Sequence, residues 1–219
     1  MLITVKKPFA EVKEFLAPYR KIGIFGCANC CSVCQTGGSE QIKEMAEKLN
    51  DKEIVFSLSC EAPCDQRIAR RDLRRISKLL EGVDAVLMLT CGIGVQSVSK
   101  VTDKVLIPGV NTVFPGSVAR IGEYYEFCNT CGDCILAETG GICPVTLCPK
   151  GLVNGPCENS QDGKCEVWDF ERDCVWQMIY DRLRQRGRVD GLAKIRDARD
   201  WSGRREPREI LSKTPIKSG

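Results

Sequence analysis

Histidine is missing from this chain of 219 residues. It is the side chain that ordinarily exchanges protons near neutral pH, so its absence excludes Ser/His/Asp and Cys/His catalytic arrangements. A P-loop and a complete dinucleotide fingerprint are missing as well. Thr36-Gly37-Gly38 and Cys91-Gly92-Ile93-Gly94-Val95 are only fragments of such turns, and we expect their glycines to let the backbone bend around a metal centre. These absences favour a non-catalytic protein.

Long apolar runs and a strong excess of charge are also missing. No run approaches the roughly 20 residues of a membrane span. The opening segment, MLITVKKPFAEVKEF, has no continuous apolar stretch followed by a small-residue cleavage site. The 32 basic residues nearly balance the 29 acidic ones, which gives no sign of nucleic-acid binding. We therefore expect a cytoplasmic protein with no membrane span and no nucleic-acid partner.

Cysteine is what the chain has in abundance, with 15 residues. Structural disulfides are rare in a reducing compartment, and an odd number of cysteines argues against a closed disulfide framework. Thiolates without imidazole suit soft metals, above all iron–sulfur clusters. The sequence therefore predicts metal centres.

The first part of the chain alternates between strand and helix patterns. Short apolar runs predict buried strands at 21–26, 53–59, 84–90 and 104–107. Apolar residues at helical spacing predict helices over 8–19, from an N-cap at Ser39 to Leu49, over 69–80 and around 94–100. Such alternation predicts an α/β domain over 1–126, with a parallel Rossmann-like sheet and helices on both faces.

Three cysteines follow these strands directly: Cys27, Cys60 and Cys91. The carboxyl ends of parallel strands meet at one edge of a sheet, so we expect these thiols to come together there. The loop after the first strand adds Cys30 and Cys34. We favour Cys27, Cys30, Cys60 and Cys91 as ligands, with Cys34 as the main substitute. Two alternatives stay open, namely that Cys60 and Cys91 are packing residues, and that Cys27 and Cys30 form a thioredoxin-like redox pair.

Two further cysteines of this region are expected to pack rather than bind metal. Cys31 adjoins Cys30 and should point elsewhere, and Cys64 is expected to be a small buried hydrophobe.

From residue 127 the chain becomes rich in Gly, Pro and Asn, and residues 127–168 predict an irregular cysteine-rich metal-binding module. Its candidate ligands are Cys128, Cys131, Cys134, Cys143, Cys148, Cys157 and Cys165. The opening C-x2-C-x2-C matches the start of a ferredoxin run, and Cys143 and Cys148 each precede proline. The match is partial, because eight residues separate Cys134 from Cys143 where a ferredoxin has three. A four-cysteine zinc site and free thiols are the alternatives.

C-terminal helices are expected over 169–198. The main one, over 170–186, would carry Cys174 as a packed residue and end at Gly187. Residues 199–219 predict a basic tail that wraps a partner or stays loose.

Several strings carry a resemblance to a known family. They are KIGIFGCANCCSVC (21–34), LTCGIGVQ (89–96), CNTCGDC (128–134), ETGGICP (138–144), KGLVNGPC (150–157), GKCEV (163–167) and WQMIYDRL (176–183). Over roughly residues 1–192 the chain resembles the methylenetetrahydrofolate reductase C-terminal family, the small iron–sulfur subunit that accompanies a flavin-bearing reductase subunit in anaerobic bacteria. It departs from the family pattern at Cys31 and at Glu158-Asn159.

The resemblance implies an electron-transfer subunit with one or two [4Fe-4S] clusters and with zinc as an alternative in the second module. FAD or FMN would lie only in the partner subunit, where 5,10-methylenetetrahydrofolate is reduced to 5-methyltetrahydrofolate in the reductive acetyl-CoA (Wood–Ljungdahl) pathway. Ferredoxin, a diaphorase or a heterodisulfide-reductase-like assembly would be the donor. A non-redox zinc scaffold that anchors the reductase to a larger complex, and a thiol-disulfide or metal sensor, are the competing interpretations.

Overall fold

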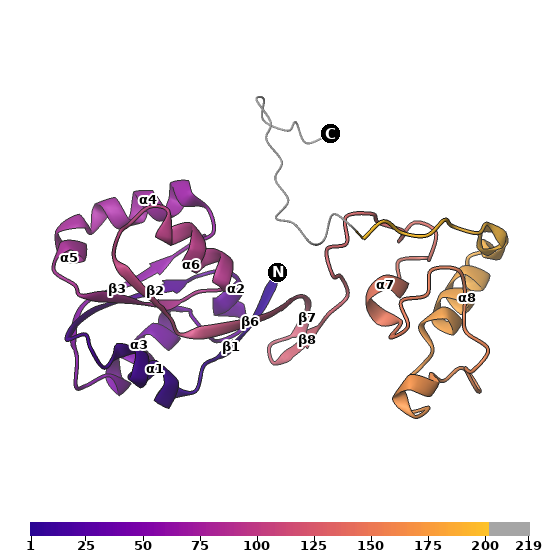
Figure 1. Cartoon of the computed structure of the whole chain (residues 1–219), viewed down its shortest axis with the longest axis horizontal. Helices are drawn as coiled ribbons and strands as arrows, with labels where there is room; N and C mark the ends of the chain where they lie inside the picture. Colours follow the sequence, from indigo (N-terminus) through magenta and orange to yellow (C-terminus); the bar gives the residue numbers. More distant parts are fainter. Residues whose placement is uncertain (202–219) are drawn as a thin grey trace. The chain divides into compact units, whose positions relative to one another are not determined.

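The computed structural model describes residues 1–201, so most of the basic tail expected over 199–219 lies outside the described residues. The chain divides into two compact units, Met1–Glu126 and a second one that starts at Phe127 (Figure 1). Among the described residues no helix is long and apolar enough to cross a membrane.

A four-stranded parallel sheet forms the centre of the first unit, in the order β3-β2-β4-β5. Its strands are β2 (Lys21–Cys27), β3 (Glu53–Cys60), β4 (Ala85–Leu89) and β5 (Val105–Pro108). All residues of β4 are buried, as a strand covered on both faces requires. The α/β class and the parallel sheet expected from the sequence are confirmed.

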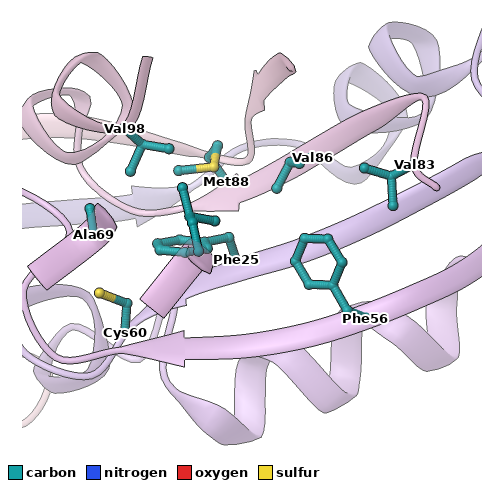
Figure 2. Packing of buried hydrophobic residues seen from close by; sticks show 9 residues of the cluster. Phe25, Phe56, Cys60, Ala69, Val83, Val86, Met88 and Val98 are labelled. Atoms are coloured by element: carbon teal, nitrogen blue, oxygen red, sulfur yellow. The ribbon is translucent and has the colours of Figure 1, made fainter. Parts of the chain in front are cut away.

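Helices cover both faces of this sheet (Figure 1). On one face, α1 (Phe9–Leu16) and α3 (Ser39–Lys48) pack on residues of β2 and β4 through Val12, Leu16 and Ile42. On the other, α4 (Gln66–Arg75) and α6 (Gly92–Ser99) pack on Phe25, Phe56 and Met88, and Figure 2 shows this second cluster.

Two details of the helices differ from the sequence-based expectation. The helix expected over 69–80 is two, α4 and α5 (Ser77–Glu81), because Ile76 leaves helical geometry at φ −113° and ψ 21°. The break leaves both Ile76 and Leu80 packed against the core of that face. Gly38, and not Ser39, is the N-cap of α3, and its N–H donates to the Gln41 side chain at 3.1 Å.

Four strands of the first unit were not predicted. β1 (Leu2–Lys6) pairs antiparallel with β6 (Val110–Pro115), and β7 (Ser117–Arg120) forms a hairpin with β8 (Glu123–Tyr125). β6, β7 and β8 are mostly exposed or half-buried, and β1 buries only Ile3 and Thr4, so none of the four is buried throughout as β4 is. A single-turn helix, α2 (Cys30–Val33), follows β2.

The second unit has little regular structure. It contains α7 (Pro144–Leu147), the turns η1 (Glu166–Trp168) and η2 (Val189–Ala193), and one longer helix, α8 (Val175–Gln185). Its core gathers around α8, and the buried members are Ile142, Cys174, Val175, Trp176, Ile179 and Leu183. The expected packing of Cys174 is therefore confirmed.

The ends of α8 refine the expected helix over 170–186. It begins only at Val175, because Asp169 and Phe170 lie in the left-handed region at φ +50° and +60°, Asp173 forms a bridge with Lys164, and Cys174 is extended. It ends as expected at Gly187, whose φ of +62° allows the Arg188 N–H to donate to the Leu183 carbonyl at 2.9 Å.

Candidate metal centres

The strand-end cysteines of the first unit meet at one edge of the sheet. Cys27 and Cys60 end β2 and β3, where they are register partners, and the Ala28 N–H donates to the Cys60 carbonyl at 2.8 Å. Cys91 is the N-cap of α6, two residues beyond the end of β4. The topology therefore brings three segments that are distant in the sequence to one place, which is where open parallel sheets form their sites.

Cys31 belongs to this place, contrary to the expectation that it points elsewhere. It is fully buried in a cluster with Cys27 and Cys91. The reason is α2, which turns the chain directly after β2 and directs the second residue of its single turn back toward the strand end. The sequence could not show this, because adjacency to Cys30 fixes no direction until the turn is known.

The thiol of Cys27 lies in an environment that favours its charged form. The Cys31 thiol donates to it, and this hydrogen bond, with smaller contributions from the backbone N–H groups of Cys31, Asn29 and Cys30, lowers the pKa of Cys27 to about 6 against the effect of burial. The same pairing raises the pKa of Cys31, and burial raises the pKa of Cys91. A Cys27 thiolate stabilised by the Cys31 thiol and several backbone N–H groups is suited to binding a soft cation.

The loop after α2, at Thr36 and Gly37, is hydrogen bonded to two cysteines of this cluster. Gly37 accepts from the Cys27 N–H at 2.9 Å and donates to the Cys31 carbonyl at 3.1 Å. A Cβ at Gly37 would lie 1.8 Å from the Leu89 carbonyl oxygen, so only glycine permits this approach to β4. Next to it, the buried hydroxyls of Thr36 and Thr4 are hydrogen bonded at 2.6 Å, which ties the loop to β1.

Cys60 lies beside this cluster with its thiol packed in the core. It belongs to the hydrophobic cluster with Phe25 and Ala69, as Figure 2 shows. Burial, reinforced by a hydrogen bond to the Asp72 carboxylate, raises the pKa of Cys60 to about 12. As it stands, Cys60 therefore has the character of a packing residue on the strand next to the cluster.

The remaining cysteines of this unit surround the cluster. Cys30 is half-buried at the start of α2, and Cys34 is buried with its Sγ 3.8 Å from the Leu2 carbonyl. Cys64 was expected to be buried and is exposed, because it lies in the loop between β3 and α4, where Ser97 Oγ donates to its carbonyl at 3.1 Å. Leu2 packs against the Cys27, Cys31 and Cys91 cluster, so β1 covers one side of it.

In the second unit, the first group of cysteines lies on two neighbouring loops. Cys128, Cys131 and Cys134 share one loop, and Cys143 is the N-cap of α7. Asn129 Nδ2 donates to the Val145 carbonyl at 3.4 Å, which joins that loop to α7. Arg199 Nη2 lies 3.0 Å from Cys131 Sγ and donates to it.

The second group surrounds a different feature. Cys148, Cys157 and Cys165 line a cavity of about 20 Å³ together with Cys174, which sequence reasoning assigned to packing alone. Cys174 is both a core residue and part of this wall. The only sequence signal for its second role was its spacing, which continues the series of Cys148, Cys157 and Cys165.

The donor chemistry of these sites fits soft metal. Within residues 1–201 no three or more Cys, Asp or Glu side chains are arranged to hold a single ion. An iron–sulfur core, however, is an extended group bound by separate thiolates, so its ligands need not converge on one point. Cys27, Cys31 and Cys91, with Cys30, Cys34 and Cys60 next to them, could hold one core, and Cys128, Cys131, Cys134 and Cys143 could hold another.

A known family model matches part of the chain. Residues 107–202 match the family model described as methylene-tetrahydrofolate reductase C terminal. This segment is similar to that family over 96 of the 219 residues of the chain. The resemblance expected from the sequence is thereby confirmed for these residues, which include every cysteine of the second unit. The N-terminal part of the chain, with the Cys27, Cys31 and Cys91 cluster, lies outside the segment matched to the methylene-tetrahydrofolate reductase C-terminal family. No curated protein and no solved structure matches the chain.

Proposed function

We propose that this protein is the iron–sulfur electron-transfer subunit of a methylenetetrahydrofolate reductase. It passes electrons to a flavin in a partner subunit, which reduces 5,10-methylenetetrahydrofolate to 5-methyltetrahydrofolate. The family match supports the reductase, and the observation that carries the electron-transfer role is the buried Cys27, Cys31 and Cys91 cluster at the sheet edge.

The residues of the first unit have separable tasks in this proposal. Cys27 supplies a thiolate at neutral pH, because the Cys31 thiol and the N–H groups of α2 stabilise its charge. Cys91 supplies a ligand from the start of α6, whose amides favour negative charge near Cys91. Gly37 and Thr36 hold the loop after α2 against β1 and the end of β2. Together these residues keep water away from the thiols.

The absence of histidine agrees with a relay and not with the reduction step itself. A bound cluster would carry one electron at a time, whereas a flavin accepts single electrons and passes two on as hydride. The chain contains no histidine, which is the side chain that most often transfers protons at neutral pH. The proton and hydride chemistry therefore belongs to the partner, and ferredoxin, a diaphorase or a heterodisulfide-reductase-like assembly supplies the electrons.

The first test is the metal content of the anaerobically purified full chain. We expect iron and acid-labile sulfide with a broad visible absorption that bleaches on addition of dithionite. Cys27→Ser and Cys91→Ser should each remove a large part of the iron. Cys64→Ser, an exposed cysteine of the same unit, is the matched control and should retain it. A colourless chain that contains only zinc would support the scaffold interpretation instead.

The second test addresses the direction of electron flow. The flavin subunit is mixed with reduced ferredoxin with and without this chain, and flavin bleaching is followed by stopped flow. We expect fast bleaching only when the chain is present, and less of it with Cys27→Ser. Equal rates with and without the chain would exclude it as the electron route.

A further inference from the structure

Four cysteines of the second unit surround one small cavity. Cys148, Cys157, Cys165 and Cys174 reach it from four separate parts of the chain, which are spaced nearly evenly in the sequence. All four are free thiols. They are separate from Cys128, Cys131, Cys134 and Cys143, none of which lines this cavity.

The backbone fixes two of these cysteines at diagonal positions on either side of one antiparallel bridge. The Cys165 N–H donates to the Arg172 carbonyl at 2.9 Å, and the Cys174 N–H donates to the Gly163 carbonyl at 2.7 Å. Both bonds flank the antiparallel bridge between Lys164 and Asp173. Cys165 and Cys174 are therefore fixed relative to each other by main-chain contacts, and not by chance packing of side chains.

The other two cysteines, Cys148 and Cys157, line the same cavity from other parts of the chain. Cys148 follows α7 and packs against the core cluster that contains Cys174. Lys150 lines the same cavity as Cys157 and forms an ion pair with Glu166, next to Cys165. The ammonium group of Lys150 thus lies where it would offset negative charge on a set of thiolates.

The segment between these cysteines has little else to order it. From residue 149 to residue 174 the only helix is the three-residue turn η1, and the bridges are isolated. Asp162, Asp169 and Phe170 lie in the left-handed region, which is unfavourable for residues other than glycine. Such a segment needs a crosslink, and a metal held by cysteines from all of its parts supplies one.

We propose that Cys148, Cys157, Cys165 and Cys174 bind one structural Zn²⁺ as four thiolates. The lining indicates the ion, because four cysteines around one small cavity are the ligand set of a structural zinc site. Zinc bound by four cysteines forms a closed tetrahedral site, with each sulfur about 2.3 Å from the metal. The thiols line the cavity without converging, so binding turns them inward. Zinc has no redox chemistry, and this site is independent of the proposed electron transfer.

Zinc content of the full chain tests the proposal. The chain is purified anaerobically, and zinc and iron are measured together. We expect about one zinc per chain, lost in Cys174→Ser and retained in Cys64→Ser, with iron unaffected by either substitution. Cys174→Ser that retains its zinc, or a chain that contains iron and no zinc, would overturn the assignment.

A second measurement does not depend on the folding of a variant. The metal-free, reduced wild-type chain is alkylated with and without added Zn²⁺, and each cysteine is quantified by peptide mass spectrometry. Zinc should protect Cys148, Cys157, Cys165 and Cys174 by at least about tenfold and leave Cys64 reactive. Protection of Cys143 in place of Cys174, or disulfides among the four in the anaerobic chain, would refute the proposed ligand set.

Discussion

Replacing Gly37 by alanine should strongly destabilise the first unit, because the new methyl group has no space. Its Cβ would lie 1.8 Å from the Leu89 carbonyl oxygen and 2.9 Å from the carbonyl carbon. Both contacts are to backbone, so no side-chain rotation relieves them. Reaching even 3.0 Å requires the loop to move 1.2 Å away from β4. That movement also breaks the Gly37 hydrogen bonds to Cys27 and Cys31.

The expected loss is large for a single methyl group. Overpacking in a core costs typically 1–3 kcal/mol, and we expect more than about 4 kcal/mol here because the clash is between backbone segments and hydrogen bonds are lost as well. For a unit of this size the midpoint of thermal unfolding should fall by more than about 10 °C. Far-ultraviolet circular dichroism of the metal-free chain measures it.

The chain offers two internal controls for this experiment. Gly82→Ala adds the same methyl group in the same unit, but its nearest neighbour is 3.5 Å away, so its midpoint should change little. All three tryptophans lie in the second unit, so tryptophan fluorescence should show that unit unchanged in Gly37→Ala. Equal unfolding midpoints for Gly37→Ala and Gly82→Ala would refute the described contact of this loop with β4.

Three further substitutions test other parts of the structure. Ile179→Ala removes a fully buried side chain of the second core and should cost about 2–5 kcal/mol in urea unfolding followed by tryptophan fluorescence, whereas Ile195→Ala, at a position 80% exposed, should change stability by less than about 0.5 kcal/mol. Thr36→Val leaves the buried Thr4 hydroxyl without its partner and should cost about 1–3 kcal/mol, and the Thr4→Val/Thr36→Val double variant should cost less than the sum of the singles. The backbone N–H groups of Lys21 and Arg20 lower the pKa of Asp84, so its stabilising effect is complete above the unfolded-state pKa of 3.8 and is lost as pH falls through the lower folded-state pKa. Asp84→Asn should therefore lose less stability than the wild type between pH 5 and pH 2, and parallel urea-midpoint profiles would contradict this.

The sheet was predictable because its buried strands are short runs of apolar residues in the sequence. Residues 85–89 are continuously apolar, and Ile22 and Ile24 alternate faces with Phe25, since helices cover both sides. The register that makes Cys27 and Cys60 neighbours follows from strand ends alone. β1 and β6 escaped prediction because each is stabilised by its partner across more than 100 residues, and their own sequences carry only a weak pattern.

The candidate sites were predictable in position and not in detail. Strand ends located Cys27 and Cys91, but the inclusion of Cys31 depends on a single turn of helix, and the burial of the Cys60 thiol depends on which face of β3 it occupies. Cys174 shows the same limit. Its spacing correctly predicted a core residue, but it gave no sign that Cys174 also lines a cavity with three other cysteines. Local turns fix side-chain direction, and single-sequence patterns say little about them.

The position of β1 has a consequence for handling the protein in air. Leu2 packs on the buried thiol cluster, Cys34 Sγ approaches its carbonyl, and the Met1 amino group donates to the Gly116 carbonyl at 3.1 Å. The first strand therefore shields these sulfurs from dissolved dioxygen. Deleting residues 1–6, or fusing a bulky tag that pulls β1 from β6, should convert a slowly oxidised thiol cluster into a rapidly oxidised one.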